Sequence, residues 1–265
     1  VGRSKPDGEV EAVARAITGE SFDAITRGVE VSPATTLPEA LVIVHCWRAG
    51  LRSLSVAVLL RALGWGEVLI LEGGYKAYRR HVIDSLAAAA LPRSFVLRGL
   101  TGVGKTLVLR ELEELRPGWT LDLEGHARHR SSILGMVGLE PVGQKAFEGD
   151  IAGRLRAGFP SDLVVYEGES RKVGDRIVPA QIWGSLTSGT NLKLKTSVER
   201  RVEALREDYL ASEGSRGALL EQLPFIEQRL GPVKWKGVLT GLLKADRIDE
   251  LVEALLEHYY DPLYS

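Results

Sequence analysis

The sequence predicts an α/β fold in two parts: an αβ unit at residues 1–90, then a larger parallel α/β unit at residues 91–265 that ends in a helical tail. Three observations support this prediction. Short apolar, β-branched runs alternate with helix-forming segments in both parts. A glycine-rich turn joins one such run to a helix near residue 100, and residues 216–260 have a helical pattern throughout.

In the first part, apolar runs predict two buried strands, each followed by a helix. Residues 9–17 and 20–28 are weakly helical in pattern, and a loop is expected at 32–38. The expected strands cover 41–44 and 67–71, and the helices cover 53–63 and 75–86. Gly64 stops the first helix, and residues 87–92 form a plausible linker.

In the second part, strands alternate with helices again. The expected strands cover 94–98, 119–123, 162–166 and 191–196. A helix is expected at 105–115, before Pro117 and Gly118, and another begins after Ser197, a favourable N-cap residue.

Composition and charge limit the classes of function. The 265 residues are 45% apolar and carry 34 basic against 35 acidic side chains, a net charge of −1. This balance predicts no global attraction to nucleic acid, so RNA contacts must come from local basic patches. No run of 18 apolar residues and no signal-peptide core is present, which predicts a cytoplasmic protein without a membrane partner. Cys46 is the only cysteine, which excludes an internal disulfide.

Residues 99–106 read Gly-Leu-Thr-Gly-Val-Gly-Lys-Thr and match the G-x-x-x-x-G-K-T pattern of a phosphate-binding loop. The glycines let successive backbone N–H groups converge on a phosphate at the start of a helix. Lys105 would reach outer phosphate oxygens, and the Thr106 hydroxyl would hold Mg²⁺. The predicted phosphate ligands in the loop are Gly99, Thr101, Gly102, Gly104, Lys105 and Thr106.

Side chains beyond the loop could complete this site. Glu167 ends an apolar strand, where a carboxylate often holds Mg²⁺; a surface salt bridge is the alternative. Asp122 and Glu124 could orient a substrate. Arg171, in the loop after Glu167, could close over phosphate. With one cysteine and no H-E-x-x-H pattern, Mg²⁺ is the only metal that the sequence implies.

Two basic clusters could contact the backbone of an RNA, although a solvated charged face explains each equally well. Arg128 and Arg130 belong to one cluster, at residues 126–130. Arg79 and Arg80 belong to the other, on the helix expected at 75–86.

Cys46 begins a short loop between a strand and a helix, with the sequence Cys-Trp-Arg-Ala-Gly-Leu-Arg-Ser. Loop amides, the helix N-terminus and the cations of Arg48 and Arg52 would all favour a thiolate. A buried, inert thiol is the alternative. Trp47 could stack on a base, but a core position is the favoured interpretation.

The cysteine loop resembles the active-site loop of rhodanese-type sulfurtransferases, in which a Cys opens a loop closed by Arg-Ser. The resemblance narrows with Leu71-Glu-Gly-Gly-Tyr-Lys-Ala-Tyr-Arg79 and the phosphate loop, which together look like the tRNA 2-selenouridine synthases. Further similar blocks are Asp122–Gly125 with His129–Ser131, Gln144 with Phe147-Glu148, and Glu167–Gly174. The matching blocks run from about residue 44 to 206.

The resemblance implies a reaction. Members of that family replace the sulfur of 2-thiouridine in tRNA with selenium from selenophosphate, through an intermediate geranylated by geranyl diphosphate. By this resemblance, Cys46 would carry a persulfide or perselenide and Arg52 would order its loop. The phosphate loop would bind geranyl diphosphate or selenophosphate with Mg²⁺.

Residues 1–40 contain no match to the Asp-Val-Arg-type element of the family's first rhodanese strands. Either a second chain completes that sheet, or the chain is a truncated or diverged member. Two alternatives stay open beside the RNA-modifying transferase. One is a small-molecule kinase or NTPase with a vestigial rhodanese module, which the strand followed by Val198-Glu-Arg-Arg201 would suit. The other is an inactive fragment that needs a partner chain.

Overall fold

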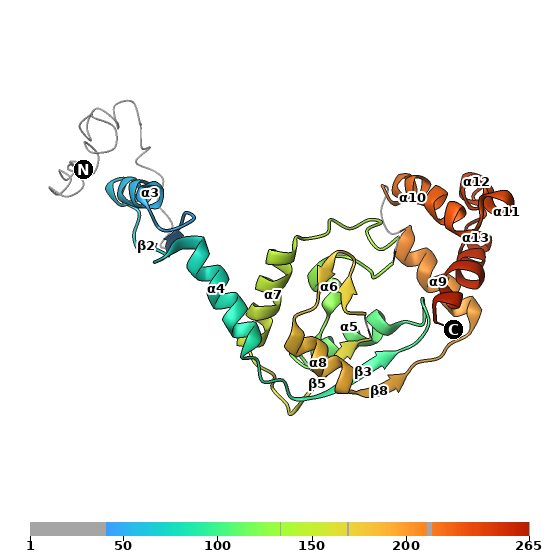
Figure 1. Cartoon of the computed structure of the whole chain (residues 1–265), viewed down its shortest axis with the longest axis horizontal. Helices are drawn as coiled ribbons and strands as arrows, with labels where there is room; N and C mark the ends of the chain where they lie inside the picture. The colour runs from blue at the N-terminus through green and yellow to red at the C-terminus, as the bar shows by residue number, and fades with distance from the viewer. Residues whose placement is uncertain (1–40, 133, 169, 211–213, 265) are drawn as a thin grey trace. The chain divides into compact units, whose positions relative to one another are not determined.

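A computed structural model of the chain describes residues 41–132, 134–168, 170–210 and 214–264 (Figure 1). Contacts divide the chain into two compact units, at residues 1–83 and 84–265. The helices expected at 9–17 and 20–28 and the loop at 32–38 lie outside the described residues.

The described part of the N-terminal unit contains the strands and helices that the sequence predicts. Strands β1 (Val42–Val44) and β2 (Val68–Ile70) pair in parallel, and α3 (Leu51–Ala62) connects them. Helix α4 (Gly74–Ala87) follows β2. Burial of Ala57 on α3 and Val68 on β2, which are 1% and 2% exposed, anchors this small βαβ arrangement.

The C-terminal unit is built on a parallel four-stranded sheet with the order β4-β5-β3-β8. Its strands are β4 (Thr120–Leu121), β5 (Leu163–Glu167), β3 (Arg93–Arg98) and β8 (Thr190–Lys193). Consecutive residues Val96 and Leu97 of β3 are both buried, because β3 lies inside the sheet with both faces covered. The α/β prediction for this part is confirmed.

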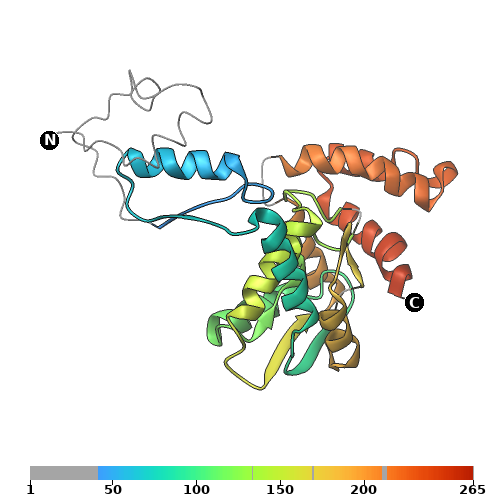
Figure 2. The same cartoon turned by 60° about the vertical axis from the view of Figure 1, so that its left-hand side comes forward.

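Four helices pack around this sheet (Figures 1 and 2). They are α5 (Lys105–Leu115), α6 (Leu123–Ala127), α7 (Gln144–Arg156) and α8 (Ala180–Ser188). Strands β6 (Lys172–Val173) and β7 (Arg176–Ile177) form a short antiparallel hairpin beyond the end of β5. Helix α5 has the predicted bounds, whereas α6, α7, α8 and the hairpin are additions to the predicted pattern.

Strand β4 is shorter than the strand predicted at 119–123. The Asp122 side chain accepts a hydrogen bond from the Gly125 amide at 2.7 Å and so caps the start of α6. Leu123 therefore begins a helix although its apolar side chain continues the strand-like run. Leu123 is 0% exposed. Its apolar side chain is required by burial in the folded unit, and this accounts for the apolar run that predicted a longer strand.

The segment after β8 is helical, as predicted, but divided into short pieces. Its elements are α9 (Val198–Tyr209), α10 (Ser215–Leu230), α11 (Pro232–Trp235), α12 (Val238–Lys244), α13 (Ile248–Leu255), a π-helical turn (Leu256–Tyr260) and a 3₁₀ turn (Asp261–Tyr264). Gly231, Gly237 and Asp246 all have positive φ angles, at the points where the chain turns between helices.

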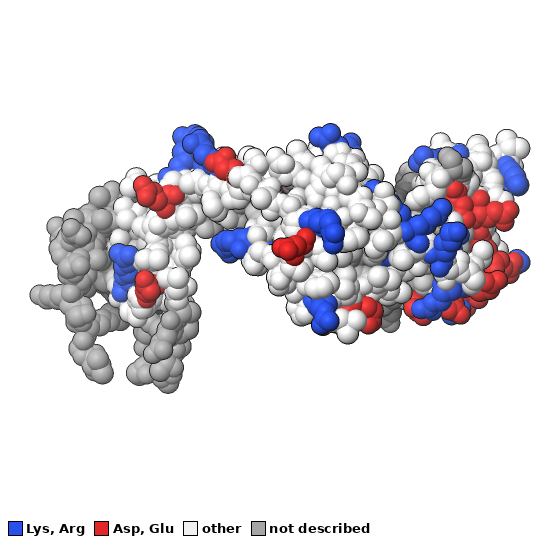
Figure 3. Space-filling model, turned by 90° about the horizontal axis from the view of Figure 1, so that it is seen from below, with Lys and Arg blue, Asp and Glu red and all other residues white. Residues whose placement is uncertain are grey.

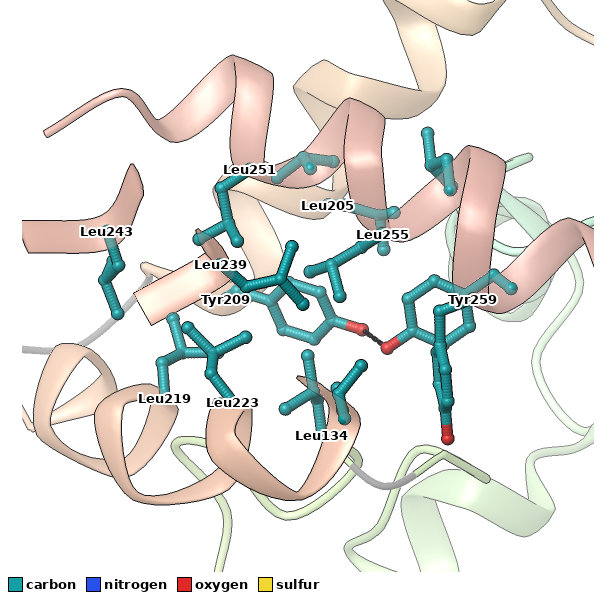
Figure 4. Close-up of a cluster of buried hydrophobic side chains, with 14 of the residues drawn as sticks. Leu134, Leu205, Tyr209, Leu219, Leu223, Leu239, Leu243, Leu251, Leu255 and Tyr259 are labelled. Atoms are coloured by element: carbon teal, nitrogen blue, oxygen red, sulfur yellow. Dashed lines mark hydrogen bonds between the residues drawn. The ribbon is translucent and has the colours of Figure 1, made fainter. Parts of the chain in front are cut away.

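These helices enclose a hydrophobic core of their own (Figure 4). Leucines from α10, α12 and α13 surround Tyr209, whose hydroxyl lies 2.6 Å from that of Tyr260. Leu134 and Val137, from the segment after α6, also join this core and tie it to the sheet region. The helical part thus belongs to the same unit as the phosphate loop.

Basic and acidic side chains are mixed over the face drawn in Figure 3, with acidic side chains gathered over the C-terminal helices. This distribution agrees with the balanced net charge of −1. Among the residues that the structure describes, the helices are too short or too polar to cross a membrane.

Candidate functional sites

The phosphate loop connects β3 to α5, as the sequence predicts. Gly104 caps α5 with a φ angle of 90°, and Gly102 has a φ angle of 77°. A Cβ on Gly102 would lie 2.9 Å from the Arg201 carbonyl oxygen, so the loop approaches α9 more closely than a larger residue allows. The Lys105 amine donates a hydrogen bond to the Gly99 carbonyl at 3.3 Å, across the loop.

Thr106 and Glu167 meet at the carboxyl end of the sheet. The Thr106 hydroxyl lies 3.0 Å from Oε1 and 3.2 Å from Oε2 of Glu167. Glu167 is the last residue of β5, lies beside Leu97 of β3 and is only 2% exposed. The alternative interpretation, in which Glu167 forms a salt bridge at the surface, is therefore wrong.

The Thr106–Glu167 pair fits Mg²⁺ in chemistry, since a hydroxyl and a carboxylate are hard oxygen donors. Within the described part of the chain, no three His, Cys, Asp or Glu side chains gather as a metal cluster. A Mg²⁺ ion here would therefore take its remaining ligands from water and substrate phosphate, as this ion commonly does.

A cavity of about 700 Å³ opens over the phosphate loop. Of the predicted residues, it is lined by Thr101, Gly102, Gly104, Lys105, Thr106, Arg128, Arg130 and Glu167. Gly99 and Arg171 are not among its lining residues, whereas Lys172 is. The far wall includes Tyr209, Tyr259, Tyr260 and Leu263 from the helical part. The volume suits a small molecule with both phosphate and apolar groups.

The two carboxylates expected to orient a substrate also hold the backbone. Besides the Asp122 cap on α6, Glu124 accepts a hydrogen bond from the Ser131 amide at 2.5 Å. Both side chains line the cavity. They fix the segment that carries Arg128, which is exposed and has a φ angle of 49°.

Arg130 is engaged with its own unit rather than extended into solvent. Its guanidinium donates to the Val137 carbonyl at 2.9 Å and to the Asp208 carbonyl at 3.3 Å, and lies 3.9 Å from the Asp208 carboxylate. His129 beside it also lines the cavity, and burial lowers its pKa, so the imidazole is neutral near pH 7.

In the N-terminal unit, the Cys46 sulfur is surrounded by hydrogen-bond donors. The Gly50 amide donates to Sγ at 3.1 Å, and the Ser53 hydroxyl lies 3.3 Å from it. The Ser53 hydroxyl and the amides of Arg48 and Gly50 lower the pKa of Cys46 to about 6, which favours the thiolate at neutral pH. The inert buried thiol is therefore not supported.

The groups that lower the pKa of Cys46 are not all those that the sequence predicts. The guanidinium groups of Arg48 and Arg52 do not contribute to the lowered pKa, whereas the backbone amide of Arg48 does. Both arginine side chains are exposed. They remain available for a substrate.

The first turn of α4 forms backbone hydrogen bonds with the cysteine loop. The amides of Tyr75 and Lys76 donate to the carbonyls of Cys46 and Trp47 at 2.9 and 3.1 Å. Gly74 has a φ angle of 61°, and a Cβ there would lie 2.2 Å from the Cys46 carbonyl oxygen. The glycine at the end of the Glu72-Gly-Gly74 turn therefore allows the close approach of the cysteine loop to α4.

Trp47 is not a core residue, contrary to the favoured interpretation. It is 49% exposed, and its ring lies 5.8 Å from that of Tyr75. Arg79 and Arg80 follow on α4, at positions three and four residues after Lys76, so the three share one side of the helix. Arg80 is exposed and Arg79 is half-buried.

Sequence reasoning missed the Arg201–Asp261 pair, in which Arg201 also donates a hydrogen bond to the Thr101 carbonyl of the phosphate loop. The pattern Val198-Glu-Arg-Arg201 includes Arg201 but does not predict this contact, which joins α9 to the 3₁₀ turn 60 residues later. Only the packing of the helical part brings the two together.

Known proteins resemble this chain over most of its length. A family model described as the tRNA 2-selenouridine synthase AAA domain matches residues 92–265. A tRNA 2-selenouridine synthase of Cupriavidus necator is 35% identical over 252 residues, which are 83% of this chain and 66% of the relative. One of Pseudomonas fluorescens is 33% identical over 260 residues, 87% of this chain and 68% of the relative.

The chain thus spans about two thirds of the length of the relatives it matches. No solved structure matches it.

Proposed function

Because this chain belongs to the tRNA 2-selenouridine synthase family, we propose that it exchanges sulfur for selenium at 2-thiouridine in tRNA. The observation that carries the proposal is the phosphate loop of the matched domain, in which Thr106 meets the buried Glu167 at a cavity of about 700 Å³. Such a site suits a phosphorylated co-substrate bound with Mg²⁺.

In the proposed first step, the phosphate loop holds the diphosphate of geranyl diphosphate. The sulfur of 2-thiouridine attacks the first carbon of the geranyl group, the carbon–oxygen bond breaks, and diphosphate leaves with its electron pair. Lys105 and the loop amides would stabilise the charge that develops on the leaving diphosphate. Thr106 and Glu167 would hold the Mg²⁺ ion, which neutralises part of that charge.

In the proposed second step, selenium replaces the geranylated sulfur. We place Cys46 in this step as a nucleophile: its thiolate attacks C2 of the uracil ring and the geranyl thiolate leaves. The selenium of selenophosphate then attacks C2 and releases Cys46, and water cleaves the phosphorus–selenium bond to give phosphate. Selenophosphate selenium is already reduced, so this route needs no oxidant, whereas loading a perselenide on Cys46 would.

The remaining assignments follow from the same proposal. Arg79, Arg80 and Arg128 would contact the tRNA, whereas Arg130, also expected there, would support this surface through its contacts with Val137 and Asp208. The cytoplasm would be the place of reaction. Strands from a second chain would extend the β1–β2 pair, since a two-stranded sheet alone is marginally stable.

The test is mass spectrometry of nucleosides from 2-thiouridine tRNA incubated with the protein, Mg²⁺, geranyl diphosphate and selenophosphate. Lys105→Ala should abolish geranylation. Cys46→Ala should preserve geranylation and abolish selenium incorporation. Ser55→Ala serves as a control, because the Ser55 hydroxyl donates to the Leu51 carbonyl of its own helix at 2.6 Å.

Two results would contradict the proposal. Absence of any modified nucleoside with wild-type protein would reject a stand-alone transferase. Release or transfer of the γ-phosphate of ATP, in a separate incubation of the protein with ATP and Mg²⁺, would then favour a kinase or NTPase. Selenium incorporation that survives Cys46→Ala would remove Cys46 from the exchange step.

A further inference from the structure

A buried guanidinium contacts the backbone of the phosphate loop. Arg201 lies in the first turns of α9 and is only 4% exposed. Its Nε donates a hydrogen bond to the carbonyl oxygen of Thr101 at 2.8 Å. Arg201 does not line the cavity, so it acts on the loop rather than on a bound molecule.

The other two nitrogens of this guanidinium bind Asp261. Nη1 lies 3.0 Å from Oδ2 and Nη2 lies 2.5 Å from Oδ1, a two-pronged ion pair. Asp261 begins the 3₁₀ turn that follows the helical core. The guanidinium group is planar and rigid, and here it binds Asp261 through both Nη atoms. The carboxylate therefore fixes the direction of the Nε–H bond that points at Thr101.

Two further contacts bring the same elements onto the loop. The Thr101 hydroxyl lies 3.2 Å from the Tyr264 hydroxyl, at the end of that 3₁₀ turn. Gly102 packs against the Arg201 carbonyl and the Leu205 side chain, at distances that would leave a Cβ 2.9 and 3.1 Å from them. The first half of the loop therefore rests on α9 and on the last turn of the chain.

We propose that Arg201 and Asp261 are positioning residues for the phosphate loop. The proposal rests on the phosphate binding proposed above and adds what holds the loop in its binding shape. Loop amides bind phosphate well only when they point at one place, and small displacements weaken such sites strongly. A buried guanidinium that loses its carboxylate has to reorient or take up water, and the Thr101 carbonyl loses its fixed donor.

The test is calorimetric titration of the full chain with pyrophosphate in the presence of Mg²⁺. Asp261→Asn removes the charge, and Asp261→Glu restores it with a longer side chain. The matched control is Asp249→Asn, because the Arg206–Asp249 pair also joins α9 to the helices after it, at 3.1 Å, but is exposed, and neither residue lines the cavity. Thermal unfolding is measured on each variant.

We expect Asp261→Asn to weaken pyrophosphate binding by about tenfold, Asp261→Glu to recover part of the loss, and Asp249→Asn to bind like wild type. In the geranylation assay, the KM for the diphosphate should rise more than kcat falls. If Asp261→Asn does not fold, the positioning role is tested by comparing Asp261→Glu with Asp249→Asn. The longer side chain of Asp261→Glu should still weaken pyrophosphate binding severalfold, whereas Asp249→Asn should not.

Wild-type affinity in both Asp261 variants would overturn the positioning role while leaving the phosphate site intact. Failure of wild-type protein to bind pyrophosphate would overturn the phosphate site itself and the positioning role with it.

Discussion

The Thr106 hydroxyl, at the start of α5, lies within 3.2 Å of both carboxylate oxygens of Glu167, the last residue of β5. Glu167 is almost fully buried, and a buried negative charge is stabilised by a neighbouring cation. A divalent cation between the carboxylate and a bound phosphate would act in this way. This relationship leads to the first prediction.

Glu167→Gln should remove most of the Mg²⁺ dependence of pyrophosphate binding. The amide keeps a hydrogen-bond acceptor for Thr106 but loses the charge that attracts the cation, so affinity with Mg²⁺ should fall by about tenfold or more. Titrations with Mg²⁺ and with EDTA measure the effect. Thr106→Ser is the matched control, because it keeps the hydroxyl. An unchanged Mg²⁺ dependence in Glu167→Gln would place the metal elsewhere.

The thiol of Cys46 should react with iodoacetamide at lower pH than an ordinary cysteine. Its pKa is lowered to about 6, so the thiolate fraction rises as the pH increases through that value, and alkylation should have its midpoint there. Labelling is specific because the chain has one cysteine. The measurement is the alkylation rate between pH 4 and pH 10, a range that brackets the ordinary thiol value.

Ser53→Ala should move that midpoint upward, because the Ser53 hydroxyl is the largest cause of the lowered pKa. Arg52→Gln should leave it in place, since that guanidinium does not contribute. Ser55→Ala, on the same helix, controls for loss of a hydroxyl. The opposite pattern, with Arg52 dominant, would show that charge rather than hydrogen bonding stabilises the thiolate.

The sequence predicts the parts of these sites that depend on neighbours along the chain. Helix α5 begins and ends at the predicted residues because a glycine-rich turn and Pro117-Gly118 bound it locally. The position of Glu167 follows from its place after an apolar strand. The spacing of Cys46, Arg52 and Ser53 identifies the cysteine loop. The pKa of the Cys46 thiol, however, depends on which groups face the sulfur, and residue spacing does not determine this.

Contacts between distant segments escape such reasoning. The Arg201–Asp261 pair joins residues 60 positions apart, which come together only through the packing of the helical part. Strand β4 stops at Leu121 because the Asp122 carboxylate caps a helix, a choice that the apolar Leu123 conceals. Burial in the folded unit, rather than strand formation, accounts for that apolar residue.

Gly74→Ala should destabilise the N-terminal unit and disturb the cysteine loop. A Cβ there would lie 2.2 Å from the Cys46 carbonyl oxygen, and the φ angle of 61° is unfavourable for alanine. The expected loss of stability is about 1–3 kcal/mol, measured by denaturant unfolding, together with slower alkylation of Cys46 at pH 7. Gly66→Ala is the control, because its Cβ would meet nothing within 4 Å. Equal stability of the two variants would contradict the close approach.

Arg128 and Arg130 should respond differently to replacement, although both stand in the same basic cluster. Arg128 is exposed, so Arg128→Ala should weaken tRNA binding and lower the slope of log affinity against log salt by about 1 if it contacts a phosphate. Arg130 instead donates to the Val137 and Asp208 carbonyls, so Arg130→Ala should lower the unfolding temperature first. Filter binding at several salt concentrations and thermal unfolding separate the two effects. An unchanged salt slope in Arg128→Ala would remove this arginine from the tRNA interface, and wild-type stability in Arg130→Ala would show that its carbonyl contacts contribute little to the fold.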